Sequence, residues 1–329
     1  MTQHSTPSSW SRRSALAGLA ASLAAPAVFA QAAKRPIRII VGFGPGSIND
    51  LTARELARYM SESLGQPVIV ENKPGAGGSL GTDAVAKAAP DALTLGLGTS
   101  SQLVMNVALY KSLPFDVEKD LRMIGLVSRA PMVLAARAGG PATLHALIEQ
   151  AKAKPGEISY GSAGTGSISH IVGEAFAHAA GVKLNHVPYK GNGPAMADLS
   201  GGHVDLVFDG VATSQPLAQQ KRVQLLAFGG LQRNQAIPDV PTFTEQGVRD
   251  FEAYSWNCLF APAKAPDADI ARLNQALNAA LELPAMKDRF EQNGVQVLGP
   301  STPEQADAFA RKERAHWVPF VRGLNISMG

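Results

Sequence analysis

Two stretches of this 329-residue sequence decide its fold: Ile37-Arg-Ile-Ile-Val-Gly-Phe-Gly-Pro-Gly-Ser-Ile-Asn-Asp50 and Ile158-Ser-Tyr-Gly-Ser-Ala-Gly-Thr-Gly-Ser-Ile-Ser-His170. Each passes from an apolar run through a glycine-rich loop into a segment with apolar residues at helical spacing. This order places free backbone N–H groups and a helix N-terminus at each loop, an arrangement that attracts anions. The two loops therefore predict two half-sites that close on one small carboxylate.

Residues 1–30 are typical of a cleaved export signal, because Arg12 and Arg13 precede an apolar stretch of small residues and Val28-Phe-Ala30 fits a cleavage site. The arginine pair only loosely fits a twin-arginine signal, so the Sec and twin-arginine routes both stay open. Without these arginines, the 30 Lys and Arg against 27 Asp and Glu become 28 against 27, a net charge of +1. A near-neutral surface favours neither nucleic acid nor a membrane as partner. We expect a periplasmic protein that is not inserted in the membrane.

The remaining chain alternates strand-like and helical patterns, which predicts parallel sheets with helices on both faces. At this length more than one core is usual. Ligands of such sheets lie at the carboxyl ends of strands, where both glycine-rich loops fall. No internal repeat is evident. The strands expected besides those before the two loops are 68–70, 93–97, 123–127, 132–135, 204–208 and 223–227.

Two segments read as crossings between domains: Val127-Ser-Arg-Ala-Pro131, a bridge between two strands, and the aromatic strand 251–260. They predict a first lobe of residues 31–130, a second lobe of 131–250, and a return of 251–329 to the first lobe. Helices are expected near 270–283 and 303–321 in that return segment.

Several further motifs, taken in order, resemble the Bug family of periplasmic substrate-binding receptors of tripartite tricarboxylate transporters. The resemblance spans nearly the whole chain after the export signal. The motifs are Val70-Glu-Asn-Lys-Pro-Gly-Ala-Gly-Gly78, Leu113-Pro-Phe-Asp116 with Lys119-Asp120, Tyr160-Gly-Ser-Ala-Gly164, His186-Val-Pro-Tyr-Lys-Gly191, Gly202-His-Val-Asp-Leu-Val-Phe-Asp209, Pro238-Asp-Val-Pro-Thr242, and Ser255-Trp256 with Ala261-Pro-Ala263.

The resemblance implies a type II periplasmic-binding-protein fold, with two α/β lobes and a ligand cleft between them. It implies a solute-binding receptor for a small organic carboxylate (a di- or tricarboxylate, an amino acid or an aromatic acid), held by backbone amides and ordered water. Membrane permease subunits are the expected partners, and no cofactor is implied. A ligand receptor for a signalling system is the alternative within this class.

By position, the family's binding loops map onto residues 43–50 and 164–170. The expected ligand-binding residues are Phe43, Gly44, Gly46, Ser47, Asn49, Asp50, Thr99, Ser100, Ser101, Gly164, Thr165, Gly166, Ser167, His170, Lys190 and Asp209. Gly44 and Ser47 depart from the family's usual Phe-Pro-Pro-Gly-Gly, as does the segment after Ser101, so ligand identity does not transfer from a relative. Ser47 and Asp50 fit a capping box, in which Asp50 orients the loop. For His170 packing or capping is the alternative, and for Lys190 a surface ion pair.

A secreted serine hydrolase is the alternative from another class. Gly77-Gly-Ser-Leu-Gly81 matches a nucleophile elbow, and Asp209 and His316 follow Ser79 in the right chain order. Residues 71–77 separate Ser79 from the preceding strand, however, whereas the elbow needs a tight corner, so we expect no enzyme. One cysteine, Cys258, and scattered histidines predict neither a metal site nor a disulfide.

Overall fold

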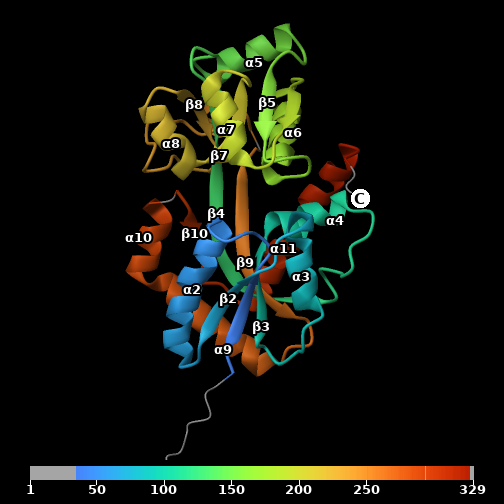
Figure 1. Ribbon diagram of the computed structural model, residues 1–329. Helices are drawn as coiled ribbons and strands as arrows, with labels where there is room; N and C mark the ends of the chain where they lie inside the picture. The colour runs from blue at the N-terminus through green and yellow to red at the C-terminus, as the bar shows by residue number, and fades with distance from the viewer. Residues whose placement is uncertain (1–34, 250, 293, 327–329) are drawn as a thin grey trace, which may run out of the picture. The chain divides into compact units, whose positions relative to one another are not determined.

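One mixed β-sheet runs through the computed structural model, which describes residues 35–249, 251–292 and 294–326 (Figure 1). The strand order is β2-β1-β3-β9-β4-β7-β5-β6, and β8 and β10 also pair with β4. The predicted export signal, residues 1–30, lies outside the described residues. The strands are β1 (Ile37–Val41), β2 (Val68–Asn72), β3 (Thr94–Thr99), β4 (Leu121–Arg137), β5 (Ser159–Ser162), β6 (Asn185–Pro188), β7 (Leu206–Gly210), β8 (Val223–Phe228), β9 (Tyr254–Pro262) and β10 (Gln296–Val297).

At one end of the sheet, β1 pairs in parallel with both β2 and β3. Four of the five residues of β1 are buried, because helices cover both faces of this part of the sheet. Helix α2 (Ile48–Leu64) contributes Leu56 and Met60 to the core there, and α9 (Asp267–Glu282) contributes Leu273 and Leu277. The spacing of these apolar residues by four positions explains why both segments are helical.

At the other end, β5 pairs in parallel with β6 and β7. Helix α6 (Ile168–Ala180) buries Phe176 against Phe208 of β7, with ring centroids 5.8 Å apart. The remaining helices are α3 (Ser79–Ala86), α4 (Asn106–Leu109), α5 (Leu144–Ala153), α7 (Asn192–Gly201), α8 (Val211–Gln219), α10 (Pro284–Gln292) and α11 (Pro303–Gly323), with single turns η1 (Ala76–Gly78), η2 (Ser101–Met105) and η3 (Thr244–Gln246).

The middle of the sheet corrects two predictions. Strand β4 is continuous over 17 residues, whereas the sequence predicted two strands with a break ending at Pro131. Pro131 forms the last pair with β9, and from Met132 onward β4 pairs with β7 and β8 instead. A proline, which lacks an N–H, is tolerated where the pairing partner changes. These central pairings are antiparallel, so the prediction of parallel sheets holds only toward the two ends.

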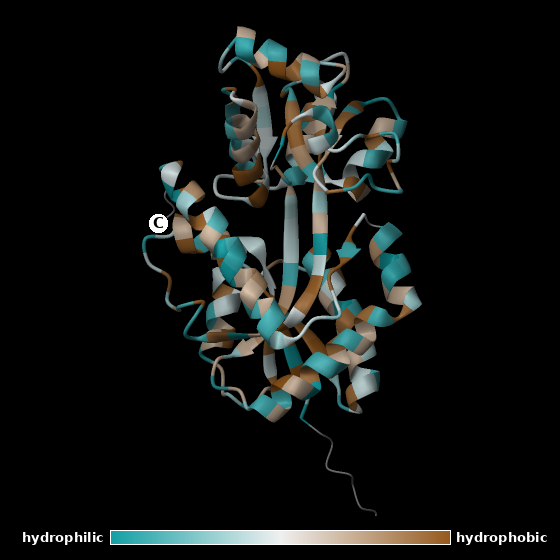
Figure 2. Ribbon diagram, turned by 180° about the vertical axis from the view of Figure 1, so that it is seen from behind, coloured by the Kyte–Doolittle hydropathy of each residue, from teal (hydrophilic) through white to brown (hydrophobic). Residues whose placement is uncertain are grey.

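In the hydropathy colouring the helices show mixed colours, and the two long strands are largely pale or teal where they run between the two ends of the sheet (Figure 2). The long strands β4 and β9 join the two ends of the sheet in both views.

The helices expected from the sequence near 270–283 and 303–321 are α9 and α11. Within the described ranges, no helix combines the length and apolar character that a membrane span requires. The lobe boundaries at 130/131 and 250/251 stay a prediction.

Candidate ligand-binding site

The first glycine-rich loop joins β1 to α2. Gly46 has a φ of +79°, and Ser47 is the N-cap of α2, where its Oγ accepts the Asp50 N–H at 3.2 Å. The Asp50 carboxylate accepts the Gly46 N–H at 2.9 Å, while the Ser47 N–H is donated to the carbonyl of Gly44 at 3.3 Å. The predicted capping box is therefore half right: Ser47 caps the helix, but Asp50 reaches one residue further back than that motif requires.

The second loop, between β5 and α6, has the same construction. Gly166 has a φ of +77°, and Ser167 caps α6 by accepting the His170 N–H at 3.3 Å. The Gly166 N–H is donated to Nδ1 of His170 at 3.0 Å, and the Ser167 N–H to the carbonyl of Gly164 at 3.1 Å.

The two loops thus form a local repeat, Gly-x-Gly-Ser-Ile-x-x, at residues 44–50 and 164–170. The sequence was expected to hold no internal repeat, because seven residues are too few to stand out, although aligning the two loops on their glycines reveals it. The repeat differs at its last position, where the acceptor is a carboxylate (Asp50) in one loop and an imidazole (His170) in the other.

Each repeat leaves backbone donors at a helix N-terminus. The first four N–H groups of a helix lack partners within it. The serine cap satisfies the third of them in α2 and in α6. The first two remain, belonging to Ile48 and Asn49 in α2 and to Ile168 and Ser169 in α6. These N–H groups, and not those of Gly46 and Gly166, can meet an anion in this conformation.

The Asp50 carboxylate is 2 % exposed and is held by Arg54, Gly46 and Asn72. The hydrogen bond from Arg54 lowers the pKa of Asp50 to about 2; burial opposes this, and bonds from Gly46 and Asn72 add to it. Asp50 is therefore an anion whose oxygens are already occupied, which agrees with the expectation that it orients the loop.

His170 lies within a buried polar cluster below the second loop. Its ring stacks on that of His186, with centroids 3.8 Å apart, and His186 Nε2 is 2.7 Å from Ser162 Oγ. Burial lowers the pKa of both imidazoles to about 4, and for His186 the charge of His170 adds to the effect. Both rings are neutral at pH 7, so Nδ1 of His170 is free to accept the Gly166 N–H. His186, which is not among the ligand-binding residues expected from the sequence, belongs to this cluster.

Thr99 is the last residue of β3 and pairs with Asn257 of the long strand β9, and Ser100 and Ser101 follow it. Ser100 Oγ is 3.2 Å from Ser255 Oγ. Two residues further along β9, Asn257 Nδ2 donates to Asn49 Oδ1 at 2.9 Å and so connects β9 to the first loop. The structure therefore brings the first loop and residues 99–101 together, and it adds Ser255 and Asn257. In the sequence, Ser255 belonged to the family motif Ser255-Trp256, and Asn257 was marked only by its place in the predicted strand 251–260.

Asp209 joins the second loop through Asn192. Its carboxylate accepts hydrogen bonds from Asn192 Nδ2 and Thr213 Oγ1, both at 2.6 Å, and Ser169 Oγ donates to Asn192 Oδ1 at 3.1 Å. Lys190 is exposed and has neither an ion pair nor a hydrogen bond with the described residues. The predicted residues thus form two clusters, one around each loop.

The three residues of the hydrolase alternative, Ser79, Asp209 and His316, each contact other residues and do not form a catalytic triad. Ser79 is 3 % exposed and accepts a hydrogen bond from Asn106 at 2.8 Å. Asp209 is held as described above, and His316 lies on α11 with its ring edge-on to Trp317. These contacts give Ser79 neither a base nor access to a substrate.

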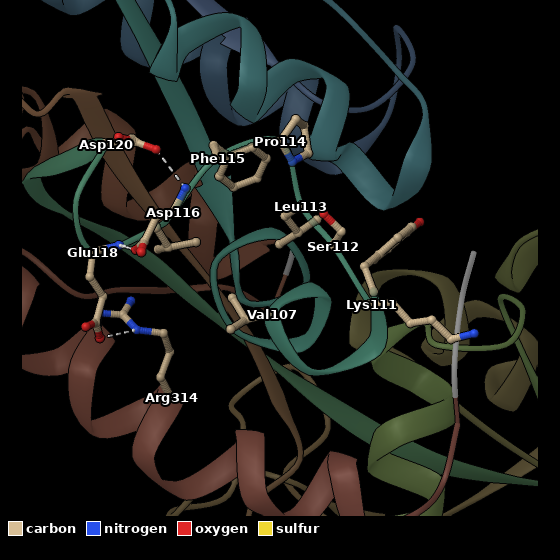
Figure 3. A pocket seen from close by; sticks show the side chains of 12 residues that line it. Val107, Lys111, Ser112, Leu113, Pro114, Phe115, Asp116, Glu118, Asp120 and Arg314 are labelled. Carbon is tan, nitrogen blue, oxygen red and sulfur yellow. Dashed lines mark hydrogen bonds and ion pairs between the residues drawn. The ribbon is translucent and has the colours of Figure 1, made fainter.

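The motif 113–116 builds a pocket of about 670 Å³ away from both loops (Figure 3). Asp116 accepts the N–H groups of Glu118 and Lys119, and Asp120 accepts the Asp116 N–H at 2.8 Å. Arg314 of α11 donates to Glu118 at 3.2 Å. None of the predicted ligand-binding residues lines this pocket, so the motif has a structural explanation in the folding of its own loop.

The model of the tripartite tricarboxylate transporter family receptor matches residues 52–326. Protein BugT of Bordetella pertussis is 38 % identical over 310 residues, covering 94 % of each chain. Two structures from Rhodopseudomonas palustris are also similar. Rpa4515 with adipate is 29 % identical, covers 88 % of this chain and 97 % of its own, and has a TM-score of 0.78. MatC with bound malate is 30 % identical, covers 87 % and 98 %, and has a TM-score of 0.76.

The family match over most of the chain makes this protein a periplasmic solute-binding receptor, a class of binding proteins and not of enzymes. The chain belongs to the tripartite tricarboxylate transporter receptor family, which includes the Bug proteins. This confirms the expected family and the periplasmic-binding-protein fold, and it sets the hydrolase alternative aside.

Proposed function

We propose that this receptor binds a small organic carboxylate between its two glycine-rich loops and presents it to the permease of a tripartite tricarboxylate-type transporter. The repeat at residues 44–50 and 164–170 carries the proposal. Each copy ends in a serine-capped helix whose first two N–H groups have no acceptor within the helix. A carboxylate has several lone pairs and so suits two such sets of donors.

The ligand class follows from the recognition chemistry. Neither loop contains an arginine or lysine, so the donors recognise the carboxylate and not the rest of the molecule. Two similar proteins hold adipate and malate, both of which are dicarboxylates. We infer a di- or tricarboxylate as the first choice, with amino acids and aromatic acids as the other members of the class.

Export and delivery complete the proposal. Residues 1–30 are proposed to act as a cleaved export signal that brings the receptor to the periplasm. There the ligand-bound receptor docks on the membrane permease. Deletion of the gene should then abolish cellular uptake of the carboxylate that the purified protein binds.

Calorimetric titration of the purified protein tests the proposal. The panel is malate, adipate, citrate, glutamate and benzoate, each paired with its methyl ester. One acid should bind reversibly and unchanged, and its ester, which lacks the charge, should bind at least about tenfold more weakly. At a hundred times its dissociation constant that acid should also add about 2.7 kcal/mol to the free energy of unfolding. Equal binding of acid and ester, or no binding across the panel, would contradict the proposal.

A further inference from the structure

A second cavity, of about 800 Å³, lies where the C-terminal half of α6 approaches α11. In Figure 1 the last turns of α11 lie beside α6. The rings of His178 (α6) and Phe320 (α11) are 5.8 Å apart across this contact. The cavity shares no residue with either glycine-rich loop, and its size is that of a small-molecule site.

Aromatic side chains form much of the wall. Phe251, Tyr254, Trp317 and Phe320 all line the cavity, and the Trp317 and Phe320 rings meet edge-on at 5.9 Å. Leu231, also in the lining, is 67 % exposed. Aromatic rings in the wall and an exposed leucine favour a ligand that carries an aromatic ring.

The charges of the lining favour an anion. Glu252 is paired with Arg129. Glu313 accepts the Tyr254 hydroxyl at 2.7 Å and the Trp256 indole N–H at 2.9 Å, so its oxygens are occupied. Arg249 and Lys312 are exposed, and neither has a partner within the described residues. These two cations are the lining charges that remain for a ligand.

We propose that this cavity is a second ligand site, specific for an aromatic carboxylate. The ring lies against Trp317 and Phe320, and the carboxylate is bound by Arg249 and Lys312. Such a site goes beyond the proposed function, because it needs neither glycine-rich loop.

Titration with 2-naphthoate, followed by calorimetry and tryptophan fluorescence, tests the proposal. We expect one saturable site whose occupancy quenches Trp317. The double variant Arg249→Glu/Lys312→Glu should weaken binding at least about tenfold, because attraction becomes repulsion. Lys264→Glu, which changes the charge of an exposed lysine outside the cavity, is the matched control and should leave affinity unchanged. Trp317→Phe should remove most of the quenching while retaining the calorimetric signal.

Further comparisons separate this site from the proposed cleft. Neutral 2-naphthylmethanol should bind at least about tenfold more weakly than 2-naphthoate. The double variant Gly46→Ala/Gly166→Ala should still bind 2-naphthoate, even where it no longer binds a cleft carboxylate. Absence of binding, an unchanged affinity in the Arg249/Lys312 variant, or loss of binding in the glycine variant would overturn the second site. Loss of binding in the glycine variant would in addition place 2-naphthoate between the two glycine-rich loops, in agreement with the proposed function.

Discussion

At the scale of single residues, substitution of Gly46 or Gly166 is predicted to lower both stability and carboxylate affinity. Both have positive φ, so alanine at either position introduces backbone strain, and at Gly46 a Cβ would meet no atom within 4 Å. Gly46→Ala and Gly166→Ala should each cost about 1 kcal/mol of stability and weaken carboxylate binding at least about tenfold, as the loop donors turn away. Chemical denaturation and calorimetry measure the two effects.

The same helices supply matched controls for this prediction. Gly65 ends α2 and Gly181 ends α6, each with positive φ and open space at Cβ. Gly65→Ala and Gly181→Ala should lose similar stability while keeping full affinity. Equal affinity losses in all four variants would show that strain anywhere in these helices, and not loop geometry, governs binding.

The histidine pair predicts a pH dependence. Its folded pKa values of about 4 lie below the ordinary 6.5, so between these pH values the unfolded chain takes up protons that the folded chain does not. This contribution to stability is complete above about pH 6.5 and is lost as pH falls toward 4. Asp50 titrates lower, between 3.8 and about 2, and stays outside that window.

His170→Asn tests this dependence. Asp50 shows that a short side chain at the equivalent position can accept the glycine N–H, so an asparagine oxygen should replace Nδ1 of His170. The variant should retain carboxylate binding at pH 7. Urea denaturation between pH 7 and 4.5 should show a smaller loss of unfolding free energy than in the parent protein. An unchanged pH slope would mean that other groups cause the loss.

Sequence could predict the residues whose role is set within a few positions, and it could not predict those set by distant contacts. Ser47 was recognisable as a helix cap from its spacing to Asp50, whereas Ser167, which caps α6, was predicted only as a ligand-binding residue. Asn257, by contrast, meets Asn49 across 208 positions, and no local pattern encodes that pairing. His186 was missed for the same reason, since only the parallel pairing of β5 and β6 brings it to the second loop.

The capping serines allow a prediction at the scale of helices. Ser47, Ser167 and Thr143 cap α2, α6 and α5 through the same side-chain bond to the N3 amide. Alanine at each should cost about 1 kcal/mol of stability. Only Ser47→Ala and Ser167→Ala should also weaken ligand binding, because α5 carries no predicted ligand-binding residue. An affinity loss in Thr143→Ala would show that general helix stability controls the site.

Strand β4 shows where reasoning about elements fails. Pro131 marks a break in any local pattern, and the sequence therefore suggested two strands with a bridge. The partners on either side of Pro131 keep the strand extended: β9 up to Pro131, β7 and β8 beyond it. Tertiary pairing overrides the local signal here, as it often does for strands.

At the scale of the whole molecule, β4 and β9 connect the two ends of the sheet, and the proposed function requires those ends to approach when a carboxylate binds. A ligand changes this equilibrium only through contacts that the closed form makes and the open form lacks. Asn257 of β9 already contacts the first loop through Asn49, so the connecting strands are coupled to one half-site.

Spin labels can measure this closure because the natural cysteine does not interfere. Cys258 is buried, and burial raises the pKa of its thiol, so it should stay unlabelled. Labels at Glu62→Cys (α2) and Lys152→Cys (α5), both exposed positions, report on opposite ends of the sheet. Their separation should shorten when the calorimetric ligand is added. A pair at Glu62→Cys and Lys264→Cys, which stays at one end of the sheet, should not change. Binding that leaves both separations unchanged would contradict closure, because the ligand would then be held without the two ends of the sheet approaching each other.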